Sequence, residues 1–142
     1  MAGWRVGMVM GSKTHLNAVL KVKSNMDSGM FYGIQKGAIA ALQSADSWFT
    51  NLNEVYASRR ALMHQLVDIL GCSYETNTAG MFVWAKLPEN QVSAESFIDK
   101  LLYEKDIFIA PGTIFGSQGE GYIRFSLCVT EEKIKEAIAR FQ

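Results

Sequence analysis

The sequence predicts an α/β (α+β) fold, in which a small mixed, mainly antiparallel sheet has helices packed on it and is preceded by a long bridging helix. Three observations support this prediction. Apolar residues recur at helical spacing from Trp48 to Leu70, and residues Tyr122–Leu127 alternate between core-forming and polar types. Amphipathic segments of helical period separate the short apolar runs of the second half, which is typical of helices packed against strands.

The first part of the chain predicts one short strand and two helices. Arg5–Met10 contains β-branched and apolar residues and ends at a Gly-Ser turn, which is typical of a strand. From Thr14, apolar residues recur at helical spacing, and a second helical segment extends from about Phe31 to Leu42. Residues 24–29 between them are rich in turn-forming residues, so we expect a loop there.

A long helix is the clearest periodic feature of the sequence. Asp46 precedes its apolar stripe and can cap the helix N-terminus, and Gly71 follows the last apolar residue. A helix of this length in a small protein is expected to bridge two compact bodies rather than to lie on one. We therefore expect the chain to divide into a segment 1–45 and a domain 46–142.

The second half predicts a strand, a helix, two strands and a final helix, in this order. An apolar strand at Met81–Ala85 is followed by a helix that Ser93 caps, and Ile107–Ile109 is expected to be a short buried strand. Tyr122–Leu127 alternates with a period of two, which predicts a strand with one buried face. Thr130 caps the last helix, whose acidic first turn suits the positive end of the helix dipole.

Composition and charge exclude several classes of protein. The 142 residues are 49% apolar and 20% charged, which is the composition of a folded chain and not of a disordered one. Fourteen basic residues balance fourteen acidic residues, so we expect neither a nucleic-acid partner nor an anionic membrane surface. No apolar run is long enough to span a bilayer and the first residues do not resemble a signal peptide, so the expected compartment is the cytoplasm.

The cysteines and histidines predict no metal site. Cys72 and Cys128 lie in different apolar segments without a CxxC spacing, so we expect both to be buried free thiols of a reducing compartment. His15 and His64 have no Cys, His or carboxylate partner at a ligand spacing.

Arg124 is the most informative single residue. A guanidinium in the middle of a strand is costly to desolvate unless an anion meets it, and its planar fork suits a carboxylate. The alternative is a partly exposed arginine paired with an Asp or Glu of the chain. The preceding loop, Ala110–Gly121, has four glycines in twelve residues and favours an anion site, because such loops bring the backbone close to a ligand. Arg5, between Gly3 and Gly7, has the same two interpretations: contact with a phosphate or a surface ion pair.

Three blocks of the sequence resemble those of a known enzyme family. Ala2–Gly7 resembles the A-G-x-R-x-G segment of class I and II aminotransferases, which are pyridoxal-phosphate enzymes of fold type I. Gly80–Trp84 is similar to the G-x-F-x-W strand of that family, and Pro111–Ser126 resembles its P-G-x-x-F-G-x-x-G-x-x-x-x-R block. The order and separation of the blocks also match, and they belong to the C-terminal portion of a family subunit.

The resemblance implies roles for both arginines. Arg5 matches the arginine that contacts the cofactor phosphate, and Arg124 matches the arginine that pairs with the substrate α-carboxylate. It also implies pyridoxal 5'-phosphate as the cofactor and places the Schiff-base lysine just before Met1, so no catalytic residue is expected within the chain. Lys13 imitates the usual context of that lysine but follows the arginine, and we interpret it as a solvated turn lysine.

The resemblance further implies a C-terminal fragment of an aminotransferase that transfers an amino group between an amino acid and a 2-oxo acid. Residues 1–45 then belong to the large cofactor-binding domain, and 46–142 form the small domain. Without the Schiff-base lysine, the isolated chain is expected to be inactive and not to bind the cofactor covalently. Two alternatives remain: a pyridoxal-phosphate-dependent carbon–sulfur lyase of the same fold, and a non-catalytic carboxylate-binding or interaction module.

The N-terminal segment also predicts an oligomer. On its own it has too little structure to bury apolar residues such as Met8, Met10 and Leu20, and exposed apolar patches drive association. We therefore expect a homodimer, formed with or without exchange of the N-terminal arm between chains.

Overall fold

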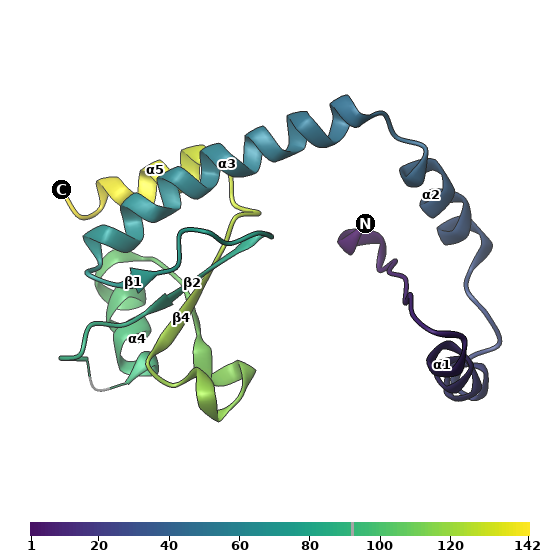
Figure 1. Ribbon diagram of the computed structural model, residues 1–142. Helices are drawn as coiled ribbons and strands as arrows, with labels where there is room; N and C mark the ends of the chain where they lie inside the picture. Colours follow the sequence, from purple (N-terminus) through teal and green to yellow (C-terminus); the bar gives the residue numbers. More distant parts are fainter. Residues whose placement is uncertain (92) are drawn as a thin grey trace. The chain divides into compact units, whose positions relative to one another are not determined.

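The chain folds into two units, and its buried core lies in the second. The computed structural model describes residues 1–91 and 93–142. Unit 1 is Met1–Phe49 and unit 2 is Thr50–Gln142, so the boundary falls inside the long helix α3 (Asp46–Ile69) (Figure 1). Among the described residues, all members of the hydrophobic core belong to unit 2.

Unit 1 consists of helices that are joined by irregular chain. A short 3-10 helix η1 (Ala2–Trp4) is followed by α1 (Lys13–Met26) and α2 (Tyr32–Leu42). Ser12 caps α1, because its hydroxyl oxygen accepts a hydrogen bond from the backbone N–H of His15. Both predicted helices are confirmed, although α1 continues through the first three residues of the loop expected at 24–29.

The strand predicted at Arg5–Met10 is wrong. These residues form no strand, and the described part of unit 1 contains no other strand with which they could pair. A strand needs a neighbour to satisfy its backbone N–H and C=O groups, so β-branched composition alone does not produce one. The N-terminal segment was also predicted to leave apolar side chains unburied, and this is confirmed: Met8, Met10 and Leu20 are all exposed.

Helix α3 confirms the predicted long helix and its end at Gly71. Gly71 has a φ of +69°, the left-handed conformation that glycine adopts without steric cost. The N–H of Gly71 donates to the carbonyl of Asp68 at 3.0 Å, and the N–H of Cys72 donates to the carbonyl of Val67 at 3.1 Å. These two bonds form a Schellman motif, which turns the chain from α3 into the sheet. Asp46 is the first residue of the helix itself.

Unit 2 contains a four-stranded sheet in the order β1-β2-β4-β3, and all of its strand pairs are antiparallel. The strands are β1 (Ser73–Tyr74), β2 (Phe82–Lys86), β3 (Ala110–Pro111) and β4 (Tyr122–Ser126). In the central pair, Trp84 lies opposite Arg124 and Phe82 lies opposite Ser126. Burial alternates along β2 and β4, so the sheet has one buried and one open face.

Three helices contribute to the core on the buried face. They are the C-terminal part of α3, α4 (Ala94–Lys105) and α5 (Glu131–Ala139), and Figure 1 shows α5 beside α3. The centre of the core is formed by Met63, Leu66, Val67, Val83, Ala85, Ile98, Leu101, Ile123, Phe125 and Ile134. The predicted Ser93 cap is confirmed, because its hydroxyl accepts a hydrogen bond from the N–H of Ser96 at 3.1 Å. Thr130 lies at the N-cap position of α5, but its side chain forms no capping hydrogen bond with the helix backbone. The predicted small, mainly antiparallel sheet with helices packed on it is thus confirmed, except that the sheet is not mixed: all of its described strand pairs are antiparallel.

Two further sequence predictions are wrong in unit 2. Ile107 and Ile109 are buried as expected, but Phe108 is 76% exposed and the strand is Ala110–Pro111 instead, because these are the residues that pair with β4. Cys128 is exposed, whereas Cys72 is buried, and that burial raises the pKa of its thiol to about 11. Of the helices in the described ranges, none combines the length and the apolar character that crossing a membrane requires.

Candidate functional site

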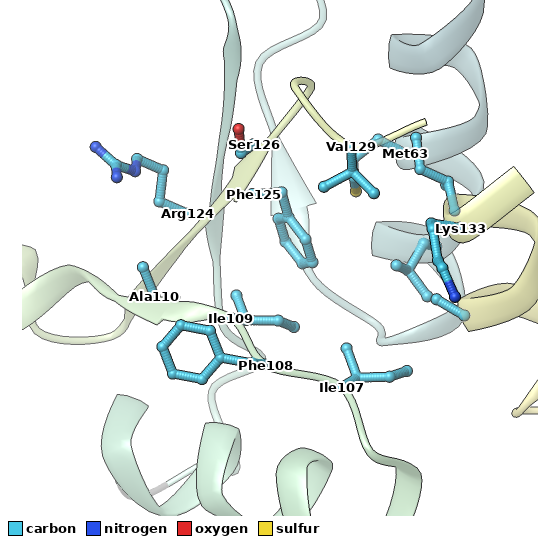
Figure 2. A pocket seen from close by; sticks show the side chains of 13 residues that line it. Met63, Ile107, Phe108, Ile109, Ala110, Arg124, Phe125, Ser126, Val129 and Lys133 are labelled. Carbon is cyan, nitrogen blue, oxygen red and sulfur yellow. The ribbon is translucent and has the colours of Figure 1, made fainter. Parts of the chain in front are cut away.

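Arg124 lies in the middle of the open face of the sheet. Its neighbours in β4, Ile123 and Phe125, are buried in the core, so the two-residue period of the strand turns Arg124 to the other side. Figure 2 shows the side chains of Arg124 and Phe125 leaving β4 in opposite directions. The strand thus anchors the arginine firmly, because the residues on both sides of it are fixed by core packing.

Aromatic rings surround the guanidinium of Arg124. Its central carbon, Cζ, lies 4.2 Å from the ring centroid of Phe82 and 4.2 Å from that of Phe115. Trp84 stacks on Tyr122 with ring centroids 5.5 Å apart and contacts Phe115 edge-on at 5.8 Å. A planar guanidinium commonly stacks its face on an aromatic ring, and this arrangement leaves its N–H donors directed outward in its own plane.

Among the described residues, no acidic side chain forms an ion pair with Arg124. The ion pairs found among the described residues join Lys23 to Asp27, and Lys133 and Arg140 to Glu136. The intramolecular ion pair that the sequence left open as an alternative is therefore absent from residues 1–91 and 93–142. A half-buried guanidinium that contacts two rings and forms no ion pair within the described residues is chemically suited to an external carboxylate.

The glycine-rich loop places Phe115 beside Arg124. It contains two short 3-10 helices, η2 (Gly112–Phe115) and η3 (Ser117–Gly119), and its glycines permit a tight internal contact. A Cβ atom at Gly112 would overlap with the carbonyl oxygen of Gly119, and one at Gly119 would overlap with that of Gly112. The glycine content of the loop predicts a close approach of its backbone to a ligand, and in the structure Gly112 and Gly119 also bring the two sides of the loop together.

Two carboxylates fasten this loop to the start of α4. Glu95 in α4 accepts a hydrogen bond from the hydroxyl of Thr113, which lowers the pKa of Glu95 below its usual value. Glu120 accepts hydrogen bonds from the N–H of Ala94 at 3.1 Å and from the N–H of Gly121 at 3.0 Å. Because the loop is held at two points, the ring of Phe115 has a defined position relative to the sheet.

A pocket of about 370 Å³ lies where α3, α5 and the chain before β3 meet (Figure 2). It is lined mainly by apolar side chains, including Met63, Phe108 and Ile134, with Lys133 on α5. Arg124 contributes to the lining, but its side chain leaves the strand on the side away from Phe125. We therefore place the candidate site on the open face of the sheet.

Arg5, the second predicted site residue, lies in unit 1 directly after η1. Its backbone φ is +57°, a left-handed conformation that costs about 1–2 kcal/mol for a residue with a Cβ atom. Its side chain is exposed and, like Arg124, has no carboxylate partner within the described ranges. Arg5 and Arg124 belong to different units, so each is a separate candidate binding group.

The remaining predictions concern groups that are not part of the candidate site. Lys13 is exposed as expected, but it is the first residue of α1 and does not lie in a turn. Within the part of the chain that the structure describes, no three potential metal ligands gather at one place. 

Phe82 and Phe115 were not among the predicted site residues. The available signals were the alternation of Phe82 and Trp84 with buried Val83, and the position of Phe115 among the loop glycines. These signals do not show that the side chains lie beside Arg124. That follows only from the pairing register, which places Trp84 opposite Arg124 and which the pattern of each single strand does not specify.

Comparison with known proteins defines the family. The family model described as "Aminotransferase class I and II" matches residues 1–141. The LL-diaminopimelate aminotransferase of Halothermothrix orenii is 39% identical over 142 residues, which is 100% of this chain and 36% of that protein. The enzyme of the same name from Oleidesulfovibrio alaskensis is 36% identical over 140 residues, covering 99% of this chain and 36% of its own length.

Solved structures show the same fold. BacF from Bacillus subtilis matches with a TM-score of 0.83 and 31% identity over 99% of this chain and 36% of its own chain. A probable N-succinyldiaminopimelate aminotransferase from Thermus thermophilus matches with a TM-score of 0.81 and 28% identity, over 93% of this chain and 35% of its own. The chain belongs to the class I and II aminotransferase family, and it spans about a third of the length of the curated relatives it matches.

Proposed function

We propose that this chain is the C-terminal part of an aminotransferase that moves an amino group between an amino acid and a 2-oxo acid. The observation that supports the proposal most directly is the guanidinium of Arg124, which has aromatic rings against it and no carboxylate partner within the described ranges. Residues 1–45 would belong to the large cofactor-binding domain, and 46–142 would form the small domain.

Arg124 would bind the α-carboxylate of the amino acid. Its in-plane N–H groups can donate two parallel hydrogen bonds to the two carboxylate oxygens, which fixes the direction of the bond to the α-carbon. Amino-group transfer requires a proton to leave and return at this carbon, so a fixed orientation raises the rate of each proton transfer. The proton-transferring base is not assigned to any residue of this chain.

Arg5 would bind the phosphate of pyridoxal 5'-phosphate. Arg5 fits this cofactor, because it is an exposed cation in a strained backbone conformation and has no acidic partner among the residues that the structure describes, which suits a phosphate. When bound, the cofactor supplies the electron sink that amino-group transfer needs. Arg5 and Arg124 would thus each hold one anionic group, the first of the cofactor and the second of the substrate.

The relatives suggest the class of amino acid. Two of the similar proteins are named for LL-diaminopimelate and a solved neighbour for N-succinyldiaminopimelate, so we propose a diaminodicarboxylate as donor and a dicarboxylic 2-oxo acid as acceptor. The proposal includes a cytoplasmic homodimer, for which the exposed apolar residues of unit 1 are the structural support.

The test of this function is kinetic and uses the complete protein that carries this chain, supplied with pyridoxal 5'-phosphate. Replacing Arg124 by Gln removes two charge-assisted hydrogen bonds, so kcat/KM for LL-diaminopimelate and for glutamate should fall by about 10- to 100-fold, mainly through KM. The matched control is Lys86→Gln, which removes an exposed cation of β2 on the same face of the sheet and should change kcat/KM less than twofold.

Two results would contradict the proposal. Equal effects of Arg124→Gln and Lys86→Gln would show that position 124 has no special role. Release of pyruvate and ammonia from cystathionine, without transamination, would identify a carbon–sulfur lyase instead. A chimera provides an independent second test. In it, this chain replaces the aligned part of the Halothermothrix orenii enzyme, and Arg124→Gln is measured in that background.

The isolated chain is predicted to be inactive. It should show no transamination, and borohydride reduction with pyridoxal 5'-phosphate should leave Lys13 unmodified, as judged by mass spectrometry of tryptic peptides. A specific, saturable adduct at Lys13 would overturn the assignment of this lysine as a solvated surface residue.

A further inference from the structure

The rings of Phe82 and Phe115 lie on different sides of Arg124. Both ring centroids are 4.2 Å from its Cζ atom, close to the separation of stacked planar groups. The ring pairs described around the site join Trp84 to Phe115 and Trp84 to Tyr122, and Phe82 forms no pair with Phe115 within residues 1–91 and 93–142. Two rings on the same side would lie against each other, so the guanidinium lies between them.

This arrangement defines how an anion can approach. With both faces covered, the guanidinium accepts a partner only along its own plane, in the gap between the two rings. A carboxylate is planar and can enter this gap with both oxygens in the guanidinium plane. A tetrahedral anion such as a phosphonate places oxygen atoms above and below that plane, where they would meet the ring edges.

We infer that Phe82 and Phe115 form a slot that positions Arg124 and admits planar carboxylates in preference to tetrahedral anions. The inference rests on the proposed role of Arg124 in binding the substrate carboxylate. Phe82 and Phe115 are positioning residues, because they act on the substrate through Arg124.

The slot also explains how Arg124 is held without an acidic neighbour. An Asp or Glu could orient the guanidinium equally well, but its oxygens would occupy the N–H groups that a ligand needs. Rings orient the guanidinium through its faces and leave those N–H groups unused. Phe82 and Phe115 are 40% and 49% exposed, so their replacement removes little core packing.

The first experiment measures the slot in this chain by NMR, without any cofactor. A proton between two ring faces resonates upfield, so the Nε–H signal of Arg124 should move downfield in Phe82→Ala and in Phe115→Ala. Phe108→Ala is the matched control, since it removes another exposed phenylalanine of unit 2 that forms no ring contact with Arg124. An unchanged Nε–H signal in both slot variants would overturn the inference.

The second experiment measures selection in the complete protein with pyridoxal 5'-phosphate. Each slot variant should raise the KM for glutamate by about 2- to 5-fold, the effect of one lost cation–π contact, with kcat nearly unchanged. The phosphonate analogue of glutamate, in which phosphonate replaces the α-carboxylate, should inhibit the parent weakly. We call the inhibition constant of the phosphonate divided by the KM for glutamate the phosphonate ratio. This ratio should fall at least threefold in Phe115→Ala and stay constant in Phe108→Ala.

The outcomes separate this inference from the proposed function. Slot variants that leave both the KM and the phosphonate ratio unchanged, while Arg124→Gln still impairs the enzyme, overturn the slot and leave the proposed function standing. If Arg124→Gln has no effect, the proposed function fails and the carboxylate slot fails with it. A larger KM together with a smaller phosphonate ratio in Phe115→Ala supports the slot.

Discussion

Arg124 is a charged residue whose position is fixed by the buried residues on either side of it in β4. Arg124 belongs to a strand whose alternate residues are fully buried, yet its guanidinium meets rings and no carboxylate within the described ranges. The energetic cost of a partly desolvated cation is thus reduced by ring contacts worth about 0.5–2 kcal/mol each. A ligand carboxylate would add the strong, charge-assisted hydrogen bonds that the chain itself does not supply.

His64 in α3 is the residue whose charge should make stability depend on pH near neutrality. Its ring lies 4.2 Å from that of Tyr74, and its Nε2 atom is buried without a hydrogen-bond partner among the described residues. Burial, followed by the nearby charge of Arg60, lowers the pKa of His64 below its ordinary value, and Asp68 opposes this only in part.

The direction of the pH effect follows from the lowered pKa. Below the ordinary histidine pKa of about 6.5, the unfolded chain binds a proton that the folded chain does not, so the free energy of unfolding should decrease as the pH falls from 7.5 to 5.5. Urea denaturation of the parent and of His64→Phe, which keeps a ring beside Tyr74 but cannot titrate, measures this. An equally large decrease in His64→Phe would assign the effect to other groups.

At the scale of elements, the loop between β3 and β4 depends on a pair of glycines. Replacing Gly112 by Ala should lower the free energy of unfolding by about 1–3 kcal/mol, because the new methyl group overlaps with the backbone of Gly119 and the loop must open. Gly11→Ala is the matched control, since a Cβ atom there meets no other atom within 4 Å. Urea denaturation measures both variants.

The loop variant should also alter the site. If Gly112→Ala opens the loop, Phe115 moves away from Trp84 and Arg124, and the fluorescence of Trp84 should change relative to the Gly11→Ala control. Equal stability of the two glycine variants would show that the loop can relax without cost, and would count against the close contact between Gly112 and Gly119.

Local patterns predicted the elements that their own side chains determine. Helices α1 to α5 and the strands β2 and β4 have periods of 3.6 or 2 in the sequence, and caps such as Ser93 and Gly71 mark their ends. The expected strand at Arg5–Met10 failed, because pairing depends on a partner that local sequence does not contain. Strands β1 and β3 also depend on a pairing partner, and they are too short to be predicted from sequence because two residues show no periodicity.

The candidate site was predictable in the same limited way. Arg124 stands out because a charge interrupts an apolar strand, and the resemblance to a family assigns it a role. Phe82 and Phe115 come from segments far apart in the sequence, and only the sheet register and the loop contact bring them to the guanidinium. Physical chemistry explains the contact once the fold is known, but a single sequence does not specify it.

At the scale of the whole molecule, the uneven distribution of burial predicts association. Neither α1 nor α2 buries a side chain, and Leu20 of α1 is 60% exposed. We expect light scattering to report a dimer or larger assembly for the chain, and Leu20→Glu to shift it toward monomer because a charge at an apolar contact is costly. The matched control is Asn17→Glu, which adds the same charge at an exposed polar position of α1.

The expected homodimer would be contradicted by a monomer whose N-terminal segment resists proteolysis. In that case the apolar side chains of α1 and α2 would need no partner, and their exposure would be compatible with a stable single chain. Equal responses to Leu20→Glu and Asn17→Glu would likewise show that the apolar character of α1 does not drive assembly.

The pairing of Trp84 with Arg124 has a consequence for how the chain folds. If β4 slipped by one residue against β2, Arg124 would turn into the core and Ile123 would turn into solvent. Burial of an unpaired guanidinium costs several kcal/mol, so such a misaligned sheet would be strongly disfavoured. Arg124, for which we propose a role in ligand binding, would therefore also oppose misaligned pairing of β2 and β4 while the chain folds.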